Sequence, residues 1–166
     1  MDRLVLYGSF TSSSSYKPML YLALARLPLS FRTVNLKTGV QNTPEYLAVN
    51  RWGVVPSLRH RGLTILQSNV ILDYLARETG HFEGRTEQQR WQAREWLSWE
   101  ADHITYVAKV RHSARFRASH PEAIAEFRPR AEAALSCAVS SALPSNETVK
   151  RSPSALSASV CHWSVK

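Results

Sequence analysis

The chain has 166 residues, of which 44% are hydrophobic and 20% charged, and its formal net charge is +8. This composition is typical of a globular protein of one domain or of two small ones. The basic residues are scattered among acids, which argues against nucleic acid as a partner, and no stretch approaches the length of a membrane span.

The two cysteines, Cys137 and Cys161, form neither a CxxC motif nor a metal-ligand spacing. A reducing compartment is therefore the simpler interpretation, and we expect no bound metal. The first residues, MDRLVLYG, lack the apolar core of a signal peptide. Together these features predict a cytoplasmic protein.

The first elements of the chain predict a βαβ unit. Residues 4–7 and 31–35 have the apolar or alternating pattern of strands. Between them, residues 16–26 have helical spacing, with an apolar set of Met19, Leu20, Ala23, Leu24 and Leu27. A helix that connects two neighbouring strands implies that these strands are parallel.

A short helix, a hairpin and a longer helix are expected next. Thr43 and Pro44 look like a helix start, with the helix reaching about residue 49. Residues 54–58 and 63–66 predict two antiparallel strands that turn at Gly62. Gln67 and Ser68 then open a helix that ends near Gly80. Its expected apolar face comprises Val70, Ile71, Tyr74 and Leu75.

The remaining chain predicts two long helices. Thr86-Glu87-Gln88-Gln89 and Ser119-His120-Pro121-Glu122 both have the pattern of a capping box. The apolar sets that follow are Ala93, Trp96, Leu97, Ala101, Ile104 and Ala108 for the first helix, and Ile124, Phe127, Ala131, Ala134 and Leu135 for the second. Pro129 should kink or restart the second helix, because an interior proline costs about 3 kcal/mol.

A block of hydroxyl residues, from Thr11 to Ser15, follows the first strand. Serines at this place can cap the next helix, and we assign that role to Ser14 and Ser15. Alternatively, one hydroxyl faces a ligand, because free N–H groups and the helix dipole favour an anion at a helix N-terminus.

Several stretches, in this order, resemble the glutathione transferase family: LYGSFTSSSSYKP, the Val55-Pro56 pair, LQSNVILDYLA and EWLSWEAD. The similarity covers about residues 3–135 and points to a serine-type, bacterial or theta-like member. It implies an α/β thioredoxin-like domain of order βαβ-α-ββα at residues 1–81. An incomplete all-α domain follows at residues 86–143, and an irregular tail at 144–166.

The resemblance implies that glutathione is the co-substrate and that its thiolate is the nucleophile. A free thiol has a pKa of about 8.5, so the site must stabilise the anion. Ser12 falls where serine-type members carry the hydroxyl that binds the thiolate, and Ser13 falls where another branch carries cysteine. We favour Ser12 and keep Ser13 as the alternative, with Thr11 a weaker third and Tyr7 assigned to the core.

The same resemblance implies contacts to the rest of glutathione. Val55 and Pro56 match a cis-proline turn whose backbone pairs with the cysteinyl residue, like one more strand. Gln67 and Ser68 match the pair that holds the γ-glutamyl end, although Ser68 would also suit an ordinary helix cap. Asp102 matches an acid that reaches the γ-glutamyl amine of a neighbouring subunit, or else it simply faces solvent.

Two positions near the glycine carboxylate depart from the family pattern. Gln41 stands where some members carry His, and Val54 stands where many carry Lys or Gln. Hydrogen bonds to charged groups are worth about 1.5–3 kcal/mol, so glutathione binding is expected to be weaker. Candidates to compensate are Lys37, Arg51 and Trp52.

The expected function is conjugation of glutathione to small electrophiles by a homodimer. Two alternatives stay open: a glutathione-dependent isomerase, dehalogenase or peroxide reductase, and a non-catalytic remnant of the family. From about Ser136 the sequence becomes rich in serine and loses its periodicity. We interpret this as a change of reading frame near residues 135–140, with a natural short variant as the alternative.

Overall fold

The computed structural model describes residues 3–116 and 121–142. The described residues form two compact units, divided between Ser98 and Trp99 within one long helix. The residues that would start the second capping box, Ser119 and His120, lie outside the described residues, as does the tail from residue 144.

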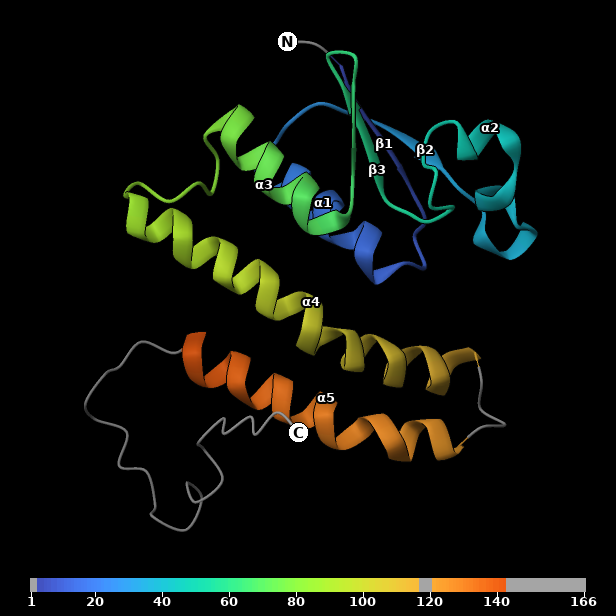
Figure 1. The fold of residues 1–166 in the computed structure, drawn as a ribbon, viewed down its shortest axis with the longest axis vertical. Helices are drawn as coiled ribbons and strands as arrows, with labels where there is room; N and C mark the ends of the chain where they lie inside the picture. Colours follow the sequence, from blue (N-terminus) through green and yellow to red (C-terminus); the bar gives the residue numbers. More distant parts are fainter. Residues whose placement is uncertain (1–2, 117–120, 143–166) are drawn as a thin grey trace. The chain divides into compact units, whose positions relative to one another are not determined.

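The first unit contains a sheet of four strands (Figure 1). Its elements are β1 (Leu4–Gly8), α1 (Ser13–Leu24), β2 (Leu29–Thr33), the 3₁₀ turns η1 (Leu36–Thr38) and η2 (Val40–Asn42), α2 (Pro44–Leu47), β3 (Ser57–His60), β4 (Leu63–Leu66) and α3 (Ser68–Thr79). The strand order is β2-β1-β3-β4. β1 pairs with β2 in parallel, and β3 is antiparallel to both β1 and β4, so the expected βαβ unit and hairpin are confirmed.

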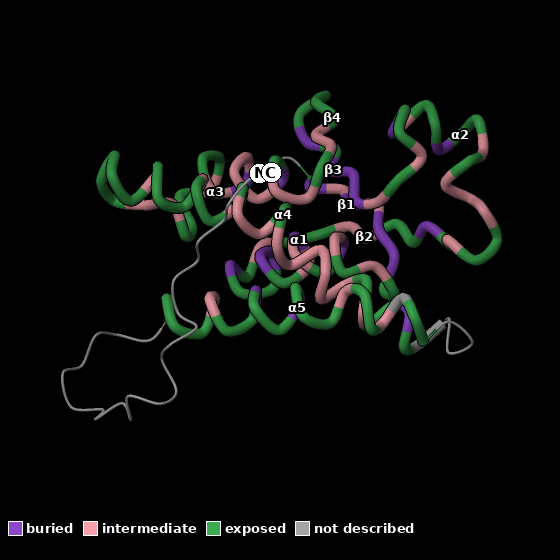
Figure 2. The backbone as a smooth tube through the Cα atoms, turned by 60° about the horizontal axis from the view of Figure 1, so that its bottom comes forward, coloured by how far each residue is buried: buried purple, intermediate pink, exposed green. Residues whose placement is uncertain are grey.

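The core of this unit lies between the sheet and two helices. α1 and α3 lie side by side on one side of the sheet, while α2 lies on the other (Figure 1). The fully buried aliphatic residues are Leu6, Leu22, Leu58, Ile71 and Leu75. Figure 2 shows how the buried segments gather in this unit, whereas the long helix α4 is mostly half-buried or exposed.

The buried face of α1 differs from the face that the sequence pattern predicts. Leu20 and Leu24 are 41% and 63% exposed, whereas Tyr21 and Leu22 are buried. The Tyr21 hydroxyl donates to the His81 carbonyl at 2.7 Å, which holds this face against the end of α3. In α3 itself, Val70 is 54% exposed, so its assignment to the apolar face is wrong.

Two strands begin at other residues than expected. β2 begins at Leu29, two residues before the predicted start. β3 begins only at Ser57, because residues 54–56 form a turn with a cis bond between Val55 and Pro56. The Val54 carbonyl oxygen accepts hydrogen bonds from the side chains of Tyr46 and Asn50 in the preceding segment, rather than from a neighbouring strand.

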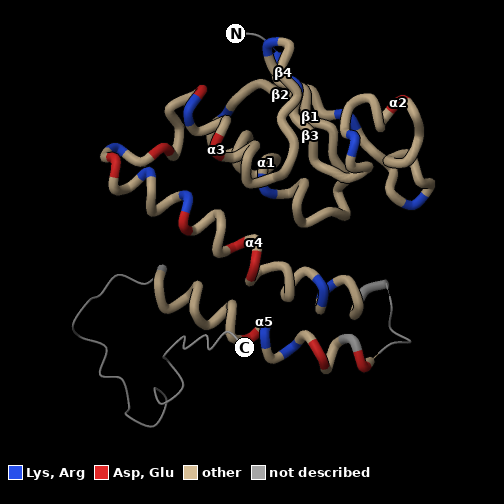
Figure 3. Tube along the Cα trace, in the orientation of Figure 1, with Lys and Arg blue, Asp and Glu red and all other residues tan. Residues whose placement is uncertain are grey.

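The long helix α4 (Glu87–Phe116) starts with the predicted capping box. The Gln89 N–H donates to Thr86 Oγ1 at 3.2 Å, and the Thr86 N–H donates to Gln89 Oε1 at 3.2 Å. These two bonds satisfy donors that a helix start would otherwise leave without partners. Lys, Arg, Asp and Glu are interspersed along the helix, as expected for a solvated face (Figure 3).

The helix α5 (Pro121–Ala142) continues through Pro129 without a break, so the expected restart is not found. Ala131 and Ala134 are buried as predicted, but Leu135 is 48% exposed. Among the described residues, no helix combines the length and the apolar character that crossing a membrane requires.

Candidate functional site

The register of the sheet brings three chain segments to one edge. Tyr7 of β1 pairs with Ser57 of β3, and Ser57 pairs with Leu66 of β4. Because β3 runs antiparallel to its neighbours, the end of β1, the start of β3 and the end of β4 lie at the same edge. The hydroxyl loop, the cis-proline turn and the start of α3 therefore meet at this edge.

In the hydroxyl loop, Ser12 is the residue that caps α1. Ser12 Oγ accepts the N–H of Ser15 at 3.2 Å, and Ser12 has extended backbone angles. Ser15 is completely buried, and its hydroxyl accepts the N–H of Ser9 at 3.2 Å. The assignment of capping to Ser14 and Ser15 is therefore wrong: Ser15 instead holds the loop against the helix. Ser13 is the first residue of α1 and is exposed.

Two buried side chains hold the cis-proline turn. The Tyr46 hydroxyl donates to the Val54 carbonyl at 2.8 Å, and the Asn50 amide donates to the same oxygen at 2.7 Å. Asn50 also donates to Ser57 Oγ at 3.1 Å, and its own oxygen accepts the N–H of Trp52 at 3.0 Å. Burial raises the pKa of Tyr46, so its hydroxyl stays protonated and keeps donating.

Sequence reasoning did not identify Tyr46 or Asn50 as part of the site. Asn50 stands three residues before Gly53, a pattern that predicts a turn. The pattern gives no indication that its side chain reaches Ser57, seven residues further on. Both residues act by shaping the backbone around Val55 and Pro56.

The start of α3 has an unusual backbone. Gln67 occupies the cap position with φ 68° and ψ 123°, an unfavourable region for a residue with a side chain. Its side chain is exposed and makes no capping hydrogen bond. Ser68 is the first residue of the helix and is half-buried, so it is not an ordinary N-cap.

Both helices that begin at this edge have a start without a neighbouring carboxylate. Neither α1 nor α3 carries an acidic residue in its first turn. The partial positive charge of each helix N-terminus is therefore not neutralised locally, and it would attract a negative group.

Gln41 lies in η2 next to the segment that leads into the cis-proline turn. A Cβ atom on Gly53 would lie 3.2 Å from the Gln41 carbonyl oxygen, and Gly53 has φ +61°, so this position requires glycine. Gln41 Oε1 is buried and has no hydrogen-bond partner among the described residues. Buried polar atoms are nearly always paired, so this oxygen is an exception to the rule, and its burial keeps it out of reach of a ligand unless the side chain rotates.

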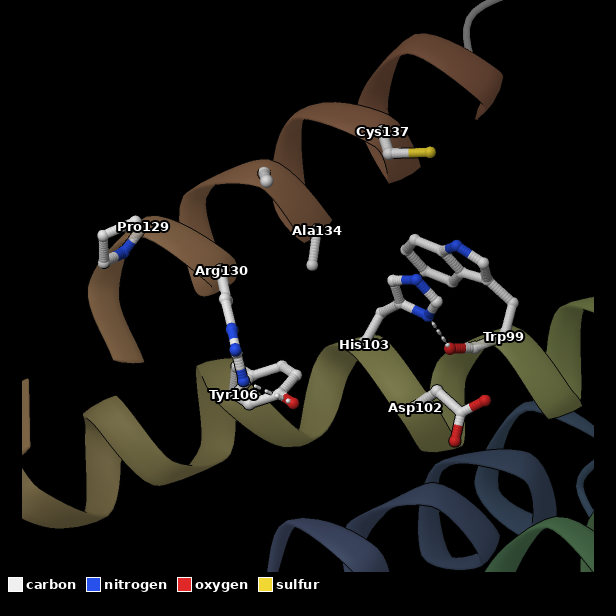
Figure 4. A pocket seen from close by; sticks show the side chains of 9 residues that line it. Trp99, Asp102, His103, Tyr106, Pro129, Arg130, Ala134 and Cys137 are labelled. Atoms are coloured by element: carbon white, nitrogen blue, oxygen red, sulfur yellow. Dashed lines mark hydrogen bonds between the residues drawn. The ribbon is translucent and has the colours of Figure 1, made fainter. Parts of the chain in front are cut away.

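Asp102 belongs to the second unit. It lies on α4, is exposed, and lines a hollow between α4 and α5 (Figure 4). Its expected contact to glutathione stays a prediction.

Comparison with known proteins gives a consistent result. Residues 3–77 match the family described as "Glutathione S-transferase, N-terminal domain". Human glutathione S-transferase theta-2 is 30% identical over 104 residues, which cover 61% of this chain and 43% of the human protein. Maleylacetoacetate isomerase of Pseudomonas aeruginosa is 40% identical over 73 residues, which cover 42% of this chain and 34% of the isomerase.

A crystal structure of a possible glutathione S-transferase from Rhodopseudomonas palustris is 30% identical, with a TM-score of 0.74. The similarity covers 81% of this chain and 63% of that one. The chain thus spans less than half the length of these two curated relatives. Residues 3–77 thus match a glutathione S-transferase N-terminal domain, and over this part the chain is similar to members of the glutathione S-transferase family.

Proposed function

We propose that the first unit binds glutathione at the edge where β1, β3 and β4 meet, and that the chain transfers its thiolate to small electrophiles. The observation that carries this proposal is the register of the sheet. It brings the cis-proline turn to the same edge as the N-termini of α1 and α3, whose first turns contain no acidic residue. Glutathione has a thiol, a peptide backbone and carboxylates, and each of these groups has a suitable partner there.

In this proposal Ser12 stabilises the thiolate, with Ser13 as the alternative. The Ser12 oxygen accepts the N–H of Ser15, but its own hydroxyl proton can still be donated to sulfur. A hydrogen bond to the anion and the N-terminus of α1 both favour the charged thiolate, so they lower the thiol pKa.

The remaining groups hold the tripeptide. The backbone of Val55, before the cis bond to Pro56, pairs with the cysteinyl residue, and the N-terminus of α3 with Ser68 and Gln67 binds the γ-glutamyl carboxylate. Gln41 lies beside the segment that leads into this turn and is proposed to stand near the glycine end of the ligand.

The proposal includes a homodimer in the cytoplasm, with a small electrophile as second substrate. Asp102 is exposed on α4 and is proposed to reach the γ-glutamyl amine of glutathione bound by the partner subunit. A glutathione-dependent isomerase is the second candidate, supported by the 40% identity to maleylacetoacetate isomerase over 73 residues. Both candidates use the same glutathione site.

The test is a titration of the purified chain with glutathione, read by its unfolding midpoint. A ligand that binds only the folded state stabilises it by about 2.7 kcal/mol at a concentration of 100 Kd, so the midpoint should rise with concentration. The absence of a saturable rise would refute the proposed site.

Ser12→Gly separates the hydroxyl from the helix cap. Glycine at an N-cap costs only a few tenths of a kcal/mol, whereas alanine costs about 1 kcal/mol. We expect Ser12→Gly to raise the pKa of the bound thiol, measured by thiolate absorbance, and to leave the affinity for S-methylglutathione unchanged. Ser13→Ala is the matched control, and if it raises the thiol pKa while Ser12→Gly does not, Ser13 is the donor.

A further inference from the structure

The first unit has a hollow of about 350 Å³ at one end of the sheet. The start of β1, the end of β3 and the turn into β4 line it, so it lies at the end of the sheet opposite the proposed glutathione edge. Three of the lining residues are arginines, Arg3, Arg59 and Arg61, and none is acidic. In Figure 3, blue segments mark this end of the sheet. The volume of the hollow is within the usual range for small-molecule sites.

The register of the sheet explains why this end is basic. Val5 of β1 pairs with Arg59 of β3, and Arg59 pairs with Thr64 of β4. Paired residues project from the same face, so these three side chains form one row across the sheet. Arg3 comes two residues before Val5 and shares this face. The buried Leu58, next to Arg59, faces the other side, where the core lies.

Two of the three arginines keep their charge available for a ligand. Arg61 Nη1 donates to Glu78 Oε2 at 2.9 Å, and this carboxylate balances its charge. The Arg59 guanidinium lies 5.7 Å from the centre of the Tyr7 ring, a contact that orients it without using an N–H donor. In the described part of the chain, neither Arg3 nor Arg59 has a carboxylate partner. Both side chains are exposed, and their positive charges repel each other.

The chemistry of these groups limits the ligand. A phosphate monoester has a charge of about −1.5 to −2 at pH 7 and three acceptor oxygens, which matches two guanidinium groups. The exposed hydroxyl of Thr64 adds a donor beside Arg59. A carboxylate has a single negative charge, so it would leave one of the two positive charges unbalanced.

We propose that this hollow binds the phosphate group of a phosphate monoester, with Arg3 and Arg59 on its oxygens and the Thr64 hydroxyl as a further donor. The proposal does not rest on the glutathione site, because it uses none of the residues assigned to that site.

The test compares phenyl phosphate with phenyl sulfate, which has nearly the same shape but one negative charge less. Titration calorimetry on the full chain, at constant ionic strength, should show a saturable site that prefers phenyl phosphate by about fivefold or more. Arg3→Gln and Arg59→Gln should each weaken the binding of phenyl phosphate about tenfold or more, because each removes a charge-assisted hydrogen bond.

Arg32→Gln is the matched control, since Arg32 is an exposed arginine of β2 that does not line the hollow. If Arg32→Gln weakens phenyl phosphate as much as Arg59→Gln does, general surface charge explains the binding and the proposal fails. It also fails if the wild-type chain shows no saturable site or no preference for the phosphate, or if Arg3→Gln and Arg59→Gln leave the affinity unchanged. Should Arg59→Gln not fold, as judged by circular dichroism, Arg3→Gln and the wild-type preference decide the question.

A phosphate monoester can be soluble or can belong to a lipid, and a second assay separates these two sources. The chain is sedimented with phosphatidylcholine vesicles that contain phosphatidic acid. Vesicle binding that Arg59→Gln abolishes and Arg32→Gln keeps would identify a lipid headgroup. Saturable binding of phenyl phosphate without vesicle binding would identify a soluble ligand. Vesicle binding that both substitutions weaken equally would be general attraction between charges and would count against the site.

Discussion

The substitution Asn50→Ala tests whether a buried amide holds the cis-proline turn in place. Asn50 is completely buried, and its side chain makes three hydrogen bonds, to the Val54 carbonyl, Ser57 Oγ and the Trp52 N–H. The Tyr46 hydroxyl remains a partner for the first two of these groups, but the Trp52 N–H loses its acceptor.

The expected cost follows from this count. A hydrogen bond contributes about 0.5–1.5 kcal/mol net, so the loss of three bonds should lower the free energy of unfolding by about 3 kcal/mol. Domains of this size have a free energy of unfolding of about 5–15 kcal/mol. With a urea m-value of about 2 kcal/mol/M, the unfolding midpoint should therefore fall by about 1.5 M.

Urea unfolding followed by tryptophan fluorescence and by circular dichroism measures this change. Asn42→Ala is the matched control, because Asn42 is exposed and lies in the adjacent 3₁₀ turn η2. Its effect should stay within about 0.5 kcal/mol, as for most surface substitutions. A loss below about 1 kcal/mol for Asn50→Ala, or one equal to that of the control, would refute the role assigned to this amide.

Three further outcomes are expected. Burial raises the pKa of the Tyr46 hydroxyl in the folded state, so as the pH rises the unfolded chain loses this proton before the folded chain does. The free energy of unfolding should therefore fall as the pH rises above about 10. Tyr46→Phe should make the urea midpoint less sensitive to pH between about 9 and 11. Thr86→Ala should cost about 1 kcal/mol by removing the cap of α4, whereas Gln88→Ala, its exposed neighbour, should cost far less in the same urea assay. Gln67→Gly should raise the free energy of unfolding by about 1 kcal/mol, because glycine tolerates a φ of 68°. The same substitution should weaken glutathione binding in the thermal-shift titration. Unchanged binding would show that the Gln67 side chain does not contact glutathione.

Much of the fold follows from local sequence patterns. The hairpin of β3 and β4 and the capping box at Thr86 depend on residues close together in the chain, and the parallel pairing of β1 with β2 follows from the helix that connects them. For such elements, side-chain alternation, turn residues and capping hydroxyls are sufficient physical causes. The cis bond between Val55 and Pro56 was expected only from the family resemblance, because the dipeptide itself favours the trans form.

The roles within the hydroxyl block depended on tertiary structure. Ser12 and Ser15 are chemically the same, and five neighbouring hydroxyls give no pattern that separates a cap from a buried contact. Ser15 is buried because its hydroxyl accepts the N–H of Ser9, at the end of the first strand. Only the fold of that loop leaves Ser12 as the cap of α1, at the edge of the sheet.

The sequence by itself determined the order of strands and helices and the family that they resemble. Tertiary structure decided which side chains of these elements are buried. In α1 the apolar residues Leu20 and Leu24 are exposed, and Tyr21 and Leu22 are buried, because the helix packs against both the sheet and α3. Likewise β3 starts at Ser57 because the Val54 carbonyl accepts hydrogen bonds from Tyr46 and Asn50. These residues are close in the chain, but the sequence pattern does not show that their side chains turn toward this oxygen.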